Sequence, residues 1–96
     1  MLKHRKIKVG KKYIEAVAMK LSSKNLIVLR GSKGYVMCGY LNLSVAEKFK
    51  DAAVKITGVS TISEALKAKV NSCTSYASKL RIYQDQFIKD VLRIIA

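Results

Sequence analysis

The segment from Tyr35 to Asn42 contains several side chains that could take part in chemistry. It holds two tyrosines, a thiol and an amide around Gly39, in a run that otherwise reads as a β-strand. A glycine inside a strand pattern is typical of a bulge or of a close approach to the backbone. We therefore predict a pocket for a small molecule here, formed by Cys38, Tyr40, Asn42 and Asp51.

Cys38 has two interpretations. As a nucleophile or ligand contact it would need a cation, a helix N-terminus or a base to stabilise the thiolate. The helix predicted to begin near Ser44 could supply such a terminus, but the single histidine, His4, lies in a basic segment. The alternative is a small buried hydrophobe, which is what free cysteine usually is. We favour this second interpretation for Cys38, and also for Cys73.

The acidic residues give little support for catalysis. Two of the six fit helix capping boxes, one fits a helix cap, and Glu15 fits a cross-strand ion pair in a basic region. Asp51 could hydrogen-bond to the backbone of a turn or line the pocket. No two are evidently paired for acid–base chemistry, and two cysteines and one histidine cannot supply the four ligands of a structural zinc site. We predict no cofactor, and these residues favour a non-catalytic protein while leaving an enzyme open as the alternative.

Positive charge is concentrated at the N-terminus. The formal net charge is +13, and residues 1–33 carry ten Lys/Arg against one acid. A basic arm over residues 1–12 could neutralise several phosphates, which predicts non-specific, salt-dependent binding of nucleic acid or another anion. The alternative is a solvated edge strand whose lysines prevent edge-to-edge pairing. The candidate binding residues are Lys3, Arg5, Lys6, Lys8, Lys11 and Lys12.

The spacing of apolar residues and turns predicts a single α+β domain. Early strands followed by helices favour an N-terminal antiparallel β-sheet, about four strands plus one later strand, packed with short C-terminal helices. Ser44 and Thr61 each begin an S/T-x-x-E capping box, and Asp85 is the expected cap of the last helix. Expected strands cover residues 3–9, 13–21, 26–29, 35–41 and 53–57, and expected helices cover 44–50, 61–68, 70–80 and 87–95.

The expected strand over residues 13–21 is largely apolar on both faces. Such a strand must be covered on both faces, so helices of the same chain could cover one face and a second subunit the other. We predict a homo-oligomer with a basic arm (1–12), a β-rich oligomerisation region (13–42) and a mainly helical region (43–96). No apolar run approaches the roughly 20 residues of a membrane helix and no secretory signal follows the N-terminus. A cytoplasmic protein without a membrane partner is expected.

Four segments resemble a known family. They are KGYVMCGYLN (33–42), VAEKFKDAA (45–53), TGV (57–59) and ALKAKV (65–70). Over residues 13–96 the chain resembles the YunC-like family, domain of unknown function 1805. The resemblance implies an α+β protein that forms tetramers through its N-terminal β-region, with no established activity and so no catalytic residue to transfer. Where the family tends to have glycines near the last turn, this chain has Arg81 and Asp85.

Two function hypotheses follow. The first is a non-catalytic binding or assembly module with a basic, anion-binding or nucleic-acid-binding surface. The second is a small-molecule-binding protein or enzyme with a pocket near Cys38.

Overall fold

The first four strands form an antiparallel meander because polar or glycine-containing turns separate a basic alternating run from three apolar runs. The fold is a computed structural model in which residues 2–96 are described. Gly10 makes the first turn with φ +63°, a left-handed conformation that glycine adopts readily. The strands are β1 (Leu2–Val9), β2 (Lys12–Lys20), β3 (Asn25–Arg30) and β4 (Tyr35–Met37).

The chain then changes from antiparallel to parallel pairing. After β4 it forms α1 (Leu43–Lys48) and returns as β5 (Ala53–Lys55), which pairs with β4 in parallel. A parallel pair needs such a crossover connection. A short β6 (Ser72–Cys73) pairs with β5 in antiparallel and completes a six-stranded sheet in the order β1-β2-β3-β4-β5-β6. The other helices are α2 (Ile62–Leu66), α3 (Ser75–Lys79) and α4 (Ile88–Ile95).

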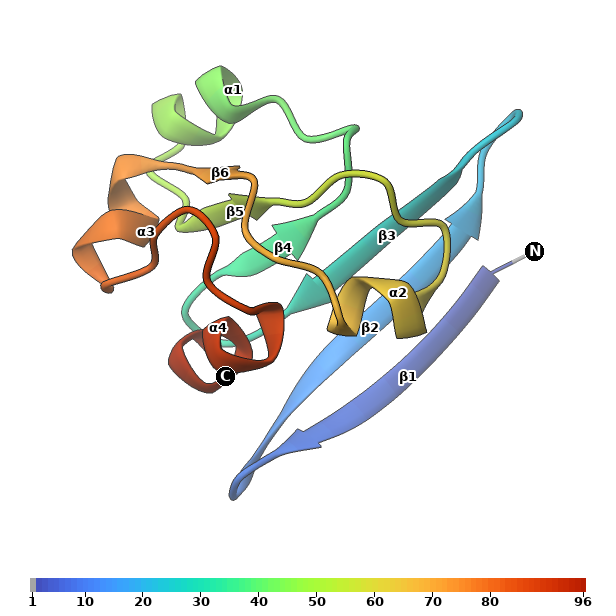
Figure 1. The fold of residues 1–96 in the computed structure, drawn as a ribbon, viewed down its shortest axis with the longest axis horizontal. Helices are drawn as coiled ribbons and strands as arrows, with labels where there is room; N and C mark the ends of the chain where they lie inside the picture. The colour runs from blue at the N-terminus through green and yellow to red at the C-terminus, as the bar shows by residue number, and fades with distance from the viewer. Residues whose placement is uncertain (1) are drawn as a thin grey trace.

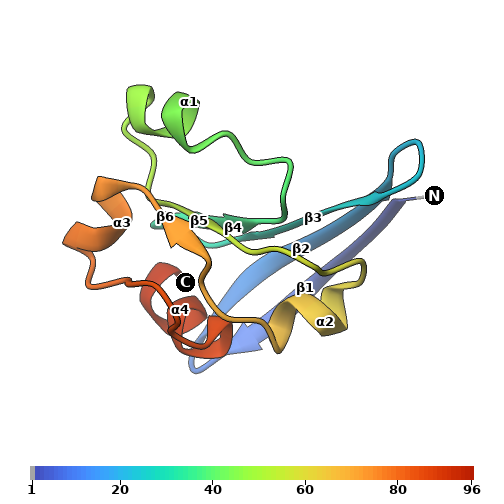
Figure 2. The same ribbon diagram turned by 45° about the horizontal axis from the view of Figure 1, so that its top comes forward.

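Helices cover the two faces of the sheet unequally (Figures 1 and 2). We call the face that carries α2 and α4 the inner face, and the face that carries α1 the outer face. The main core on the inner side joins strand residues such as Ile14, Ile27 and Leu29 to residues of α2, α3 and α4. A second, small cluster around Ala46 packs α1 against the outer face near β4 and β5. The outer face of β1, β2 and β3 has no helix over it.

The α+β class and the N-terminal position of the sheet confirm the expectation from the sequence. The helix predicted over residues 70–80 is wrong in its first half. Residues 72–73 form β6, and Thr74 then begins α3. Thr74, only 2 % exposed, explains the break: its Oγ1 accepts hydrogen bonds from the backbone N–H groups of Ala53 (3.1 Å) and Ala77 (3.3 Å) and donates to the carbonyl of Asp51 (2.6 Å).

One of the two predicted capping boxes is present. Thr61 Oγ1 accepts a hydrogen bond from the backbone N–H of Glu64 (3.1 Å). The Glu64 carboxylate reaches back as expected, but it accepts from the N–H of Ser60 (2.8 Å), one residue before the N-cap Thr61. At α1 the prediction was wrong, because Asn42 is the cap and accepts from the N–H of Val45 (3.2 Å). Glu47 is therefore not used at its own helix and accepts instead from the backbone and hydroxyl of Ser75.

The last turn also differs from the expectation. Asp85 does not cap α4, whose N-cap is Phe87 without a side-chain hydrogen bond. Asp85 and Arg81 instead have φ angles of 71° and 68°. Glycine adopts this left-handed conformation with the least strain. The turn thus has the backbone that glycines favour, at the two positions where the resemblance implies glycines.

The caps provide a test of these assignments. We expect Thr61→Ala and Asn42→Ala each to lower the free energy of unfolding by about 1 kcal/mol, because each removes the acceptor for a helix N–H. Ser44→Ala is the matched control and should change it by less than about 0.5 kcal/mol, as for a surface substitution. Urea titration followed by circular dichroism measures all three. A larger loss for Ser44→Ala than for Asn42→Ala would contradict the assignment.

Candidate functional site

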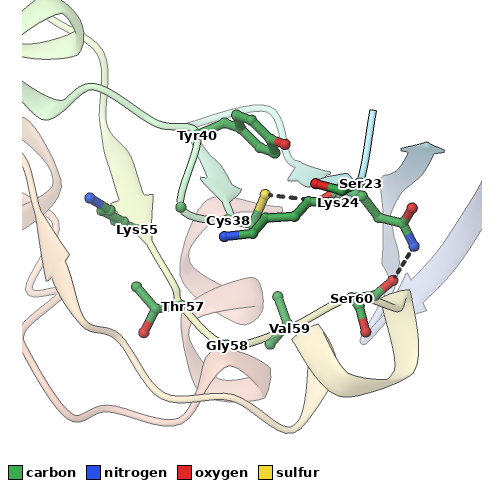
Figure 3. Close-up of a pocket in the computed structure, with 11 residues that line it drawn as sticks. Ser23, Lys24, Cys38, Tyr40, Lys55, Thr57, Gly58, Val59 and Ser60 are labelled. Carbon is green, nitrogen blue, oxygen red and sulfur yellow. Dashed lines mark hydrogen bonds between the residues drawn. The ribbon is translucent and has the colours of Figure 1, made fainter. Parts of the chain in front are cut away.

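A hollow of about 630 Å³ lies where β4 and β5 end. Two loops form its opposite walls, one following each strand, and the turn between β2 and β3 closes one side (Figure 3). We call it the strand-end hollow. Its lining residues are Ser23, Lys24, Asn25, Cys38, Gly39, Tyr40, Lys55, Thr57, Gly58, Val59 and Ser60.

The direction of the chain explains why a hollow forms here. From the end of β4 the chain leads to α1 on the outer face, whereas from the end of β5 it leads to α2 on the inner face (Figure 2). Two neighbouring parallel strands whose connections leave to opposite faces create a crevice at their carboxyl ends, and ligands of α/β proteins bind preferentially in such crevices.

Cys38 stands on the wall of this hollow but is 4 % exposed. Its Sγ accepts a hydrogen bond from the backbone N–H of Ile27 (3.4 Å) and donates to the carbonyl of Asn25 (3.6 Å). The thiol therefore continues the pairing of β3 and β4 beyond the last residue of β4. These contacts give Cys38 a structural role and leave it engaged with the backbone.

The four residues of the predicted pocket do not meet at one place. Cys38 and Tyr40 line the strand-end hollow, whereas Asn42 caps α1. Asp51 lines a different, smaller hollow of about 290 Å³ and accepts a hydrogen bond from the hydroxyl of Tyr35 (2.9 Å). Partial burial, together with this carboxylate, raises the pKa of Tyr35 to about 12, so the phenol stays protonated at neutral pH.

A second hollow, of about 600 Å³, lies on the inner side of β1 and β2 beside the start of α2. We call it the basic hollow. Three cations line it, Lys3 and Arg5 from β1 and Lys20 from β2. The other residues that line it are Ala18, Ser23, Asn25, Ser60, Thr61, Ile62 and Ser63.

The basic arm is divided between the two faces of the sheet. Lys3 and Arg5 pair with Ala18 and Ala16 and line the basic hollow on the inner side. Lys6 and Lys8 lie on the outer side, since successive residues of a strand point to opposite faces. The turn and the start of β2 carry the other two, Lys11 and Lys12. The six residues therefore do not form one continuous stripe.

The two hollows adjoin, because Ser23, Asn25 and Ser60 line both. Together they carry five Lys/Arg side chains, and the described residues that line them include no Asp, Glu or His. One carboxylate lies just behind the wall: Glu64 accepts hydrogen bonds from the backbone and hydroxyl of Ser60. These bonds lower its pKa, so it is charged at neutral pH.

Sequence reasoning missed Lys20, Lys24 and Lys55 as members of this cluster. They lie at the end of β2, in the next turn and at the end of β5. Their positions after apolar runs were visible in the sequence, but their proximity depends on the strand order. Among residues 2–96, no group of three or more His, Cys, Asp or Glu is arranged to hold a metal ion. No helix in this part of the chain is long and apolar enough to cross a bilayer.

Thiol labelling tests the structural role of Cys38. In a Cys73→Ser variant, which leaves one thiol, we expect Cys38 to react roughly tenfold or more slowly in the native state than in denaturant, because burial and hydrogen bonds limit access. The complementary Cys38→Ser variant reports Cys73, which is less buried and should react faster. Equal native and denatured rates for Cys38 would show that the thiol is open to the hollow.

Comparisons with known proteins agree with the fold and the resemblance. Residues 37–95 match the family described as "Domain of unknown function (DUF1805)". The chain is 35 % identical over 71 residues to the uncharacterized protein YunC of Bacillus subtilis (strain 168), covering 70 % of each. It is also similar to the crystal structure of TA1206 from Thermoplasma acidophilum, a protein of unknown function, with a TM-score of 0.96, 33 % identity and coverage of 100 % of this chain and 94 % of that one. With a family match over more than half of its length and a similar relative of this kind, the chain belongs to the YunC-like DUF1805 family.

Proposed function

We propose that this protein is a non-catalytic, homo-oligomeric binding module that takes an anionic ligand in the basic hollow. One observation carries the proposal: Lys3, Arg5 and Lys20 come together on one side of the sheet, in a hollow whose lining among residues 2–96 includes no acidic residue. Cations that point into a concave surface concentrate the positive potential there. The hydroxyl groups of Thr61 and Ser63, at the start of α2, add hydrogen-bond donors for a phosphate oxygen.

The side chains around the hollow support binding better than catalysis. General acid–base chemistry needs a carboxylate, imidazole or similar group within hydrogen-bond reach of the ligand. Glu64, whose carboxylate is hydrogen-bonded to the lining residue Ser60, is held at the start of α2, and its lowered pKa makes it a poor proton acceptor. Amines, hydroxyls and an amide remain, and these groups mainly hold and orient a ligand.

The preferred anion is a nucleic-acid backbone bound without sequence preference. Lysine and arginine contacts to phosphate position a chain but do not read bases. The net charge of +13 adds long-range attraction that brings a polyanion to the surface. Such binding weakens with salt, because neutralising phosphates releases condensed counterions.

The basic side chains of β1 point to opposite faces of the sheet, so two double variants of the same strand can be compared. We expect Lys3→Ala/Arg5→Ala to weaken binding of a fluorescent single-stranded RNA or duplex DNA by about tenfold, and to reduce the slope of log K against log[salt] by roughly 1.4–1.8, for two lost contacts. Lys6→Ala/Lys8→Ala removes the same charge from the opposite face and should have a clearly smaller effect. Anisotropy titrations at several salt concentrations measure both.

Two results would contradict the assignment. Equal losses for the two double variants would mean that diffuse charge, not the basic hollow, attracts the nucleic acid. Absence of binding to wild type at low salt would remove the nucleic-acid proposal altogether.

The outer face of the sheet supports the homo-oligomeric part of the proposal. Val17 and Val28 pair directly on this face, as do Leu2 and Met19, and no helix covers them. Leu2 is 62 % exposed and Met19 is 38 % exposed. The same face also carries His4, Lys6, Glu15 and Arg30, so its apolar part is limited to the two pairs above and their neighbour Leu26. A second copy packed against this apolar part would cover it.

Light scattering tests this assembly. Wild-type protein at micromolar concentration should have a mass that is a multiple of the 10.7 kDa chain. Val17→Lys should shift the mass toward the monomer, because it buries an unpaired charge in the interface. Tyr83→Lys, at an exposed position away from this face, is the control and should leave the mass unchanged. A wild-type mass of one chain would rule out the proposed oligomer.

A further inference from the structure

We infer that the strand-end hollow is a second site, which binds a small phosphorylated molecule carrying an aromatic ring, in size and chemistry a mononucleotide. The inference goes beyond the anion site in the basic hollow, since it depends on different side chains and on a ligand of a different kind. Figure 3 shows the residues that carry it.

The position of the hollow is the first reason. It lies at the carboxyl ends of the parallel strands β4 and β5, whose connections leave to opposite faces. This is the place where sheets of parallel strands bind ligands, because the diverging loops leave a crevice that side chains of neighbouring strands do not fill. Its volume of about 630 Å³ lies within the range of small-molecule sites.

The polar side chains of the hollow fit a phosphate group. Lys24 reaches in from the turn between β2 and β3, and Lys55 comes from the end of β5 on the other side (Figure 3). Each amine supplies three donors and no acceptor, and Thr57 adds a hydroxyl. The amide of Asn25 is already engaged, donating to the carbonyl of Ser60 (2.8 Å). A lining that is rich in donors and that, over the described part of the chain, contains no carboxylate favours a dianionic group over a neutral one.

The backbone of the two loops adds to this donor set. Within residues 2–96, the N–H groups of Gly39 and Gly58 have no carbonyl partner. A Cβ built on either glycine would meet no atom within 4 Å, so both stretches of backbone border open space. These are single N–H groups on two different loops, and each adds one hydrogen-bond donor at the edge of the hollow.

An aromatic surface faces this polar region. Tyr40 is 49 % exposed and forms one wall, and Val59 lies on the wall opposite (Figure 3). A flat ring placed between Tyr40 and Val59 would stack on one and pack on the other, with the phosphate beside Lys24 and Lys55. Stacking on tyrosine tolerates any base, so the site specifies the class of ligand and not one base.

Calorimetric titration of the full chain with AMP, ribose 5-phosphate, adenosine and inorganic phosphate tests the site. We expect AMP to bind most tightly, with each of the other three at least about tenfold weaker. Ribose 5-phosphate lacks the aromatic ring, adenosine lacks the phosphate, and inorganic phosphate lacks both the ring and the sugar. Absence of AMP binding at millimolar concentration would overturn the inference. Equal affinities for AMP and ribose 5-phosphate would overturn the aromatic part of the site.

Single variants place the ligand in the hollow. Lys55→Gln and Tyr40→Leu should each weaken AMP binding by about tenfold, through lost charge and lost stacking. Lys89→Gln, on the exposed side of α4, is the matched control and should leave the affinity unchanged. Equal losses for Lys55→Gln and Lys89→Gln would show that only net charge matters. Thermal unfolding confirms that each variant is folded.

The experiment also separates this site from the basic hollow. Lys3→Ala/Arg5→Ala should weaken nucleic-acid binding about tenfold and leave AMP binding unchanged, whereas Lys55→Gln should weaken AMP binding about tenfold and leave nucleic-acid binding nearly unchanged. Loss of AMP binding in Lys3→Ala/Arg5→Ala with full retention in Lys55→Gln would assign the nucleotide to the basic hollow and overturn the second site.

Discussion

The parallel pairing of β4 with β5 depends on the close approach of two backbones at Gly34 and Ala52. A Cβ on Gly34 would lie 2.4 Å from the carbonyl oxygen of Ala52, a separation that no side chain tolerates, and the next residue, Tyr35, donates its N–H to that same oxygen (3.1 Å). This contact starts the parallel ladder. Because the ladder is parallel, α1 must cross over between the strands. Both loops of the strand-end hollow consequently begin at the same edge, so the candidate site exists only because these strands run in the same direction.

Thr74 secures the same strand from the other side. Its hydroxyl joins β5, α3 and the turn at Asp51, and it is the single buried polar side chain in the described part of the chain. A buried hydroxyl is stable only when its hydrogen bonds are made, and here three are. Glu47, which leaves its own helix to hold Ser75, adds a link between α1 and α3. Short helices of five or six residues have little stability of their own, so these side-chain bonds fix their positions on the sheet.

The sequence was informative where a pattern is local. Period-two alternation and a short apolar run located the early strands, and Thr61 and Glu64 located α2. Glu15 was correctly predicted to form a cross-strand ion pair, which it makes with Arg30, and it is also hydrogen-bonded to His4 (2.9 Å). Those partners lower the pKa of Glu15. Local patterns failed where two neighbouring residues could each cap the same helix, and where a strand is very short. Asn42, and not Ser44, is the N-cap of α1, and β6 was not predicted because a strand of two residues shows no periodicity. The site was only half predictable, since Cys38 and Tyr40 are near in sequence whereas Lys24 and Lys55 meet them through strand order.

The basic arm also shows why its two interpretations, a binding surface and a protected edge, do not exclude each other. β1 is an edge strand, and its alternating side chains send Lys3 and Arg5 to the basic hollow and Lys6 and Lys8 to the outer face. Lysines along an edge oppose the addition of another strand, because the new strand would bury their charge. Open-ended pairing through β1 is therefore disfavoured. Under the proposed assembly the copies would instead meet face to face over Val17 and Val28, and the basic hollow, on the opposite side of the sheet, would stay accessible to an anion.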